Sequence, residues 1–121
     1  MAALAIPLRP ASVEAWKAWI KECTGPRRKE FEDFNRRMKL TEHRVWYMEH
    51  APGPLAIVIH EGPGGDTMLK NLAKSDHPFD TWFRQRVAEF HGVDFSALTD
   101  RPPSQNVMDW RSSEAQRSAK S

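Results

Sequence analysis

Hydrophobic and polar side chains alternate in two neighbouring segments, residues 43–49 and 55–61, which flank the turn 51–54. Because successive side chains of a strand point to opposite faces, this pattern predicts a β-hairpin. One face is strongly apolar and consists of Trp46, Met48, Leu55, Ile57 and Ile59. The other face is mixed and carries His43, Val45, Tyr47, Glu49, Ala56, Val58 and His60. We expect the apolar face to pack against helices and the mixed face to line a cavity or contact a second sheet.

The turn between the two segments sets the expected register of the hairpin. A symmetric turn centred on Pro52 and Gly53 places Val45 opposite His60, Tyr47 opposite Val58 and Glu49 opposite Ala56. His43 is then diagonal to His60, within reach of a long side chain. A shift of one residue would exchange the two faces.

Strand and helix patterns alternate along the rest of the chain. Residues 3–8 and 105–110 resemble strands, and apolar residues at helical spacing predict helices between them. The expected helices run from Ser12 to Cys23, around Phe31, Phe34 and Met38, from Asp66 or Thr67 to Ala73, and from Pro78 to Phe90. Asp76 is the expected N-cap of the last helix, and Gly92 is its C-terminal glycine.

The order strand, helix, strand, strand, helix, strand predicts an α+β fold of the ferredoxin-like βαββαβ type. Such a fold has a four-stranded antiparallel sheet with helices on one face. We expect one domain over residues 1–110, because a chain of 121 residues has an ordinary size for a single domain. Residues 111–121 carry almost no apolar side chains and are expected to be disordered.

Composition limits the function classes. The net charge of +2 does not favour a nucleic-acid-binding domain. A single cysteine, Cys23, excludes an internal disulfide and a multi-cysteine zinc site, and reads as a buried small hydrophobe. The histidines form no familiar metal-binding motif, so we expect no metal. No segment approaches the roughly 18 apolar residues of a membrane span, and the N-terminus lacks secretory-signal features. We therefore expect a cytoplasmic protein.

Several segments resemble a known superfamily. These are the small opening strand, the interrupted first helix, residues 42–49, and residues 75–83 with 91–94. They look like an uncharacterised bacterial family related to the antibiotic-biosynthesis-monooxygenase-like domains of the dimeric α/β-barrel superfamily. That superfamily also includes heme-degrading monooxygenases, polyketide cyclases, muconolactone isomerases, mutarotases and stress-responsive proteins.

The resemblance implies a homodimer in which two sheets pair into a barrel, with a pocket in the barrel or beneath the helices. Because one fold hosts many chemistries, it does not select a reaction.

Three side chains on the mixed face form the candidate catalytic site, namely His60, Tyr47 and Glu49. His60 would act as general base or acid, because histidine titrates near neutral pH. Tyr47 and Glu49 would orient the substrate and stabilise charge. The alternative is a dimer interface in which these polar groups satisfy one another.

The candidate substrate-binding residues are His43, Trp46, Trp82, Phe83 and His91. The large aromatic residues among them, with Phe79, either line a pocket between sheet and helices or simply belong to the core. His91 and His77 flank the last predicted helix, where a helix histidine ligates heme in heme-degrading relatives. The full ligand set of those relatives is not present in this sequence. His77 fits more simply as part of the turn that starts the helix.

Two polar segments have structural explanations. Residues 27–39 are basic but interleaved with acids, so that Arg28–Glu32–Arg36 and Lys29–Asp33–Arg37 form i,i+4 ladders typical of a solvated helix. Residues 62–65 are glycine-rich but match no phosphate-binding pattern, which favours a flexible turn or a lid hinge.

These patterns and the resemblance together predict a cofactor-independent oxygenase, cyclase or isomerase that acts on an apolar or aromatic metabolite. We expect a homodimer formed through the sheet face, with no nucleic acid and no membrane as partner. The alternative is a non-catalytic dimeric ligand-binding or stress-response protein that uses the same pocket. Heme binding or degradation is a third hypothesis.

Overall fold

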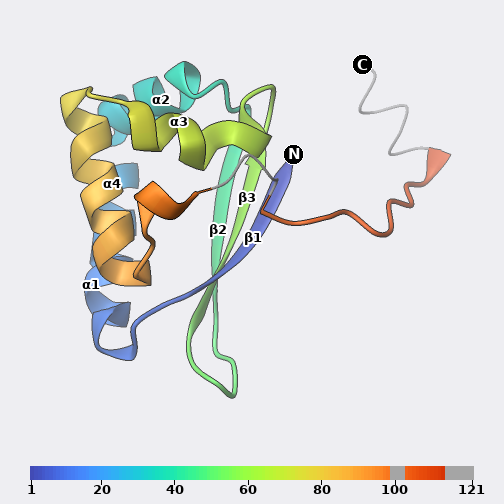
Figure 1. Cartoon of the computed structure of the whole chain (residues 1–121), viewed down its shortest axis with the longest axis horizontal. Coiled ribbons are helices and arrows are strands. Elements are labelled where there is room, and N and C mark those ends of the chain that lie inside the picture. Colours follow the sequence, from blue (N-terminus) through green and yellow to red (C-terminus); the bar gives the residue numbers. More distant parts are fainter. Residues whose placement is uncertain (99–102, 114–121) are drawn as a thin grey trace.

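Three antiparallel strands form a sheet with the order β1-β3-β2 in a computed structural model that describes residues 1–98 and 103–113 (Figure 1). The strands are β1 (Ala2–Pro7), β2 (Glu42–Met48) and β3 (Leu55–Glu61). The helices of the described residues are α1 (Val13–Thr24), α2 (Arg28–Arg37), α3 (Met68–Lys74) and α4 (Pro78–His91). The result is an α+β fold in which α1 and α4 lie on one side of the sheet (Figure 1).

The helices form where the apolar spacing predicts them. Trp16, Trp19 and Cys23 are buried along α1, because residues three and four apart share one helix face. Gly92 ends α4 with a φ of 69°, the left-handed conformation that glycine adopts most easily. One detail was wrong: the N-cap of α4 is His77, not Asp76, and the His77 Nδ1 accepts a hydrogen bond from the Phe79 amide.

The register of the hairpin differs from the expected one. His43 lies directly opposite His60, Val45 opposite Val58, and Tyr47 opposite Ala56. The cause is the turn, in which the Gly53 amide donates to the His50 carbonyl at 2.8 Å and so moves the centre to Ala51 and Pro52. Glu49 consequently lies outside the strand pairing.

The helices cover the mixed face of the sheet and not the apolar face, which corrects the prediction, although the mixed face does line a cavity as expected. The mixed face packs against the helices: Ala56 and His60 are only 0% and 3% exposed. The apolar face is open, and its Trp46 and Met48 are 43% and 42% exposed. The reason is bulk, because the helices bring large aromatic side chains that need small strand residues opposite them. We call the two surfaces the inner face and the outer face.

The predicted fourth strand is absent from the described residues. Residues 105–110 form no strand; they belong to an arm, residues 103–113, that is exposed throughout and extends away from the rest of the molecule (Figure 1). The described element order is therefore βααββαα rather than a clear βαββαβ. Residues 114–121 of the predicted disordered tail lie outside the described residues.

The glycine-rich loop is packed tightly against the chain. Gly64 and Gly65 are buried, and the Gly64 amide donates to the Lys39 carbonyl at 3.0 Å. A Cβ on Gly64 would lie 1.9 Å from the Met38 carbonyl oxygen, so only glycine fits there. In the described part of the chain, no helix has the length and apolar composition to cross a membrane.

Candidate functional site beneath the helices

A cavity of about 220 Å³ lies between the inner face of the sheet and the helices. Strands β2 and β3 contribute His43, Val45, Ala56, Val58 and His60 to its wall. Helices α1 and α4 contribute aromatic side chains, including Trp16, Trp19 and Phe83. The lining contains no Asp, Glu, Lys or Arg, so its polar groups are neutral ones. Such a wall suits an uncharged ligand, because a charged one would lose its hydration without gaining a counter-charge.

His60 is the most unusual polar group of this wall. Its side chain is almost completely buried, and its Nε2 atom has no hydrogen-bond partner among the described residues. Burial lowers the pKa of His60 to about 4, so the ring is neutral at pH 7. A buried polar atom without a partner is costly and rare in folded proteins. The hydrogen-bonding capacity of Nε2 is therefore unsatisfied, on a side chain that lines the cavity.

His43 packs edge-to-face against His60, with the ring centroids 4.7 Å apart and the planes at 82°. Its Nδ1 lies 2.9 Å from the Asn35 Oδ1 on α2. Because a carbonyl oxygen only accepts, the neutral His43 ring carries its proton on Nδ1. Burial, with a smaller effect of His60, lowers the pKa of His43 to about 3. Asn35 thus fixes the tautomer and orientation of the ring that supports His60.

Trp19 provides a second unpartnered polar atom in the same wall. Its side chain is buried, and its indole Nε1 has no hydrogen-bond partner among the described residues. An indole N–H only donates, whereas neutral histidine offers one donor and one acceptor. The cavity wall therefore combines an unused donor with an unused histidine nitrogen, which together match a carbonyl or hydroxyl group on an otherwise apolar ligand.

His91 and Cys23 complete the ionisable groups of the cavity. The His91 Nδ1 lies 3.1 Å from the Pro7 carbonyl oxygen, and burial lowers the pKa of this ring although the hydrogen bond opposes the shift. Burial raises the pKa of the Cys23 thiol to about 12, which confirms its interpretation as an inert hydrophobe. No group of three or more potential metal ligands gathers within the described ranges.

The structure brings together some of the predicted site residues and separates others. His60, His43, Phe83 and His91 all line the cavity. Trp46 points outward from the sheet, and Glu49 is exposed beyond the end of β2. Neither of them contacts the cavity.

Two further predicted residues lie next to the cavity wall but outside it. Tyr47 is half-buried beside Trp16, with the Lys17 ammonium 4.5 Å from its ring centroid. Trp82 stacks beneath the Arg27 guanidinium at 3.9 Å and contacts Trp19.

Sequence reasoning missed two residues of the site. These are Trp19 on α1 and Asn35 on α2. Their roles depend on contacts between α1, α2 and the sheet, which no local pattern encodes. The only available signal was the number of tryptophans.

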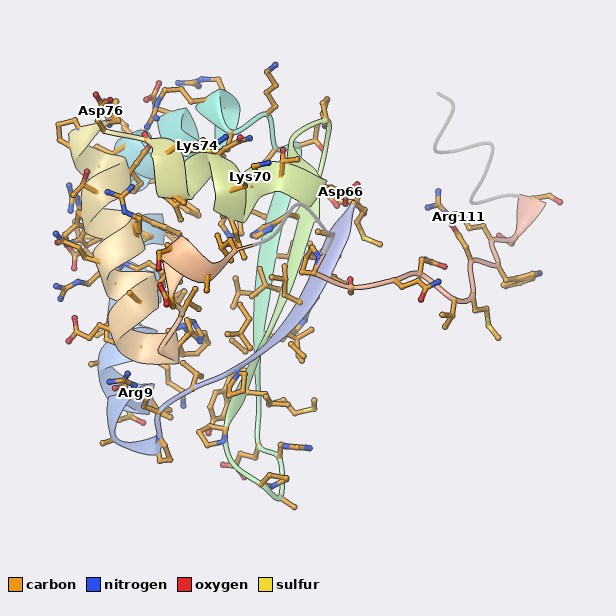
Figure 2. All side chains as sticks on the ribbon, viewed as in Figure 1. Arg9, Asp66, Lys70, Lys74, Asp76 and Arg111 are labelled. Atoms are coloured by element: carbon orange, nitrogen blue, oxygen red, sulfur yellow. The ribbon has the colours of Figure 1, made fainter. Side chains whose placement is uncertain are left out.

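A second cavity of about 260 Å³ adjoins the first and shares His60 and Leu69 with it. Its wall is more polar and includes Asp66, in the short turn of 3-10 helix before α3, and Lys70 on α3, at the end of the sheet where β1 begins (Figure 2). The Asp66 carboxylate is 3.6 Å from the N-terminal amine. His60 therefore lies between an apolar cavity and a polar one.

Comparison with known proteins adds no identification: the chain matches no protein-family model, no curated protein and no solved structure.

Proposed function

We propose that this protein binds a small, uncharged, aromatic or apolar metabolite in the cavity beneath its helices. The observation that carries the proposal is the unpartnered His60 Nε2 in an apolar wall, with the unpartnered Trp19 Nε1 in the same wall. A ligand with one hydroxyl or carbonyl group would satisfy these atoms and bury its apolar part against aromatic side chains.

The volume indicates the size of the ligand. An apolar cavity of roughly 150 Å³ accommodates benzene, whereas pockets for drug-sized ligands range from about 300 to 1,000 Å³. At about 220 Å³ the cavity suits a single substituted ring or a molecule of that size. We do not extend the proposal to heme, because a macrocycle is far larger than this.

Acid–base catalysis by His60 is the second candidate function. Its neutral ring is in the base form at pH 7 and has a free nitrogen beside the cavity. A proton transferred to Nε2 from a phenol or from the carbon next to a carbonyl would initiate an isomerisation, a cyclisation or a cofactor-independent oxygenation. The low basicity of a histidine with a pKa of about 4 favours binding over catalysis as the primary proposal.

Native mass spectrometry of protein purified from its own host is the first test. A reproducible added mass that corresponds to a small aromatic compound supports the proposal and identifies the ligand. Uptake is then tested by thermal shift with phenol, acetophenone and benzoate. We expect the two uncharged compounds to raise the melting temperature and the benzoate anion to have no effect.

Matched variants locate the binding site. Val45→Phe fills the cavity and should abolish the thermal shift, whereas Ala18→Phe, on the exposed side of α1, should leave it unchanged. His60→Gln separates the two candidate functions, because glutamine still forms hydrogen bonds but does not act as a base. If the protein is a catalyst, this variant binds and does not turn over. If Val45→Phe binds as well as the wild type, the ligand lies elsewhere and the proposal fails.

We also propose that the chain forms a homodimer through the outer face of its sheet. The support is the apolar character of this face in one copy: Ala3, Ala5, Pro7, Leu55, Ile57, Ile59, Trp46 and Met48 point away from the helices. The order β1-β3-β2 would fit three strands of a ferredoxin-like sheet, whose open face is available to a second copy of the chain. Light scattering of the purified protein tests the dimer.

A further inference from the structure

The exposed large apolar side chains of the described residues are not scattered over the surface. Apart from Met1, they form two groups: Trp46 and Met48 on the outer face, and Val107, Met108 and Trp110 on the arm. The three arm residues are 87%, 82% and 81% exposed, close to the values of an unfolded chain. Concentrated exposed apolar surface of this kind marks an interaction site.

We propose that the arm of one copy packs across the outer face of a second copy, and that the second arm packs reciprocally on the first copy. This inference rests on the proposed dimer and adds to it the segment that holds the two copies together. The occupant of the outer face is thus a named part of the same chain, residues 107–110.

The position of the arm favours contact with the sheet of a second copy over contact with the sheet of its own copy. Pro103 lines the second cavity together with Ala2 and Leu4, so the arm leaves the body beside the start of β1. From there it extends on the side of the sheet away from α1 and α4, and Arg111 lies far from the body (Figures 1 and 2). Every residue from 103 to 113 is exposed, so the arm gains no burial from its own copy.

The length of the arm suffices for the contact. The seven residues that follow Pro103 span up to about 23 Å when extended. A three-stranded sheet is only about 10 Å wide between its outer strands, because neighbouring strands lie about 4.8 Å apart. The segment can therefore cross a whole neighbouring sheet, with Met108 and Trp110 on one side of an extended chain.

Symmetry argues for a second copy rather than an unrelated partner. Each copy carries one apolar arm and one apolar face, so a two-fold dimer pairs both arms with both faces and leaves no surplus surface. The charged groups of the outer face are Glu42 and Glu61, which end the paired strands, and Arg44 on the edge strand β2, whose guanidinium lies 4.6 Å from the centre of the Trp46 ring. A hydrophobic centre within a polar rim is the usual composition of such interfaces.

The experiment combines two full-length variants that each carry one new cysteine, Val107→Cys and Met48→Cys, on chains with tags of different mass. The native Cys23 is buried and does not react under the same conditions. The variants are mixed at increasing concentration and treated with a short bis-maleimide. We expect a crosslink between the two chains whose yield rises with concentration. The control replaces Met48→Cys by Lys29→Cys on α2, which should give no crosslink above the level of random collision.

The triple variant Val107→Ser, Met108→Ser and Trp110→Ser gives an independent readout. Because these side chains are exposed in one copy, the substitutions should not affect folding, but we expect the dimer Kd to rise by about 100-fold. An unchanged Kd would overturn the role of the arm.

Light scattering of the wild type separates the remaining outcomes. A dimer without the crosslink between positions 107 and 48 leaves the proposed dimer standing and overturns the arm exchange. A monomer at every concentration overturns both. A crosslink within one chain of the double cysteine variant, at a concentration where it is monomeric, shows the arm on its own sheet and also overturns the exchange.

Discussion

His43 and His60 face each other directly across β2 and β3, with their ring centroids 4.7 Å apart in an edge-to-face contact. Neither ring has a carboxylate beside it in the cavity wall, and both have strongly lowered pKa values because of burial. Two neutral imidazoles are thus held in an apolar environment. This pair, together with His91, whose pKa burial also lowers, should make the stability of the protein sensitive to acid.

We expect the free energy of unfolding to fall steeply below pH 6.5. In the unfolded chain both histidines titrate near 6.5, whereas in the folded chain they stay neutral down to about pH 4 for His60 and about pH 3 for His43. The unfolded state therefore binds more protons in this window, and each histidine removes up to about 1.4 kcal/mol of stability per pH unit. Urea unfolding between about pH 7 and pH 5.5 measures this slope.

Two variants assign the slope to the buried pair. His60→Gln should reduce the slope of the free energy of unfolding against pH by the contribution of about one bound proton. His50→Gln, in the exposed hairpin turn, should leave the slope unchanged. The window ends near pH 5.5 because unfolded carboxylates, with pKa values near 3.9 for Asp and 4.3 for Glu, begin to bind protons below it. A stability that stays flat between about pH 6.5 and pH 5.5 would show that the two rings are not buried as neutral groups.

Replacement of Trp19 by Phe should weaken ligand binding, whereas replacement of Trp82 by Phe should not. The substitution removes the unpartnered indole N–H, so we expect about a tenfold rise in Kd for an uncharged phenol, which corresponds to about 1.4 kcal/mol. Isothermal titration measures the Kd on folded protein. Trp82→Phe is the control, because Trp82 lies outside the cavity wall. Equal losses in both variants would mean that packing, rather than the N–H donor, determines affinity.

The helices and three of the four expected strands could be predicted from the sequence because their patterns are local. The spacing of Trp16, Trp19 and Cys23 reports a helix face whatever that face contacts. Gly92, which ends α4, could be predicted for the same reason, because its left-handed conformation depends on that one residue.

The use of the two sheet faces could not be predicted from alternation alone. Leu55 and Ile57 are more hydrophobic than Ala56 and Val58, yet the smaller pair is buried. The large side chains that pack against the inner face come from α1 and α4. Part of the hydrophobic surface of this layer therefore belongs to the helices and not to the strands. The register error had a separate cause, a turn centred one residue earlier than expected. Because of these two errors, Glu49 was predicted as a residue of the candidate site, although it does not reach the cavity.

Substitution of Asp80 by Asn should destabilise the protein by about 2–3 kcal/mol, because it removes the charge of a buried carboxylate that pairs with the partly exposed Arg37 guanidinium. The Asp80 carboxylate is fully buried and accepts two hydrogen bonds from the Arg37 guanidinium, at 2.6 and 2.8 Å, and one from the Ser75 hydroxyl. These bonds join α2 to α4. Sequence spacing revealed only the contact between Arg37 and Asp33 within α2, since the other partner is 43 residues away.

Asp33→Asn is the matched control for this prediction. Asp33 also binds Arg37, at 2.8 Å, but lies on the exposed surface, so solvent screens the pair and its loss should be much smaller. Chemical denaturation of both variants at pH 7 gives the comparison. Similar losses would indicate that the link between the helices does not depend on the buried carboxylate.

Gly64→Ala should cost about 2–3 kcal/mol, because a Cβ there would lie 1.9 Å from the Met38 carbonyl oxygen and backbone would have to move. The φ of Gly64 is −96°, which alanine tolerates, so the penalty is steric. Gly53→Ala is the opposite case: its Cβ would meet no atom within 4 Å, but its φ of 146° is strained for alanine. We expect the free energy of unfolding to fall by only about 1 kcal/mol in Gly53→Ala.

The residue after Gly64, Gly65, packs against the His60 carbonyl oxygen, so Gly64→Ala should also weaken phenol binding while Gly53→Ala does not. Unchanged stability and affinity in Gly64→Ala would show that the loop yields easily, as a hinge would.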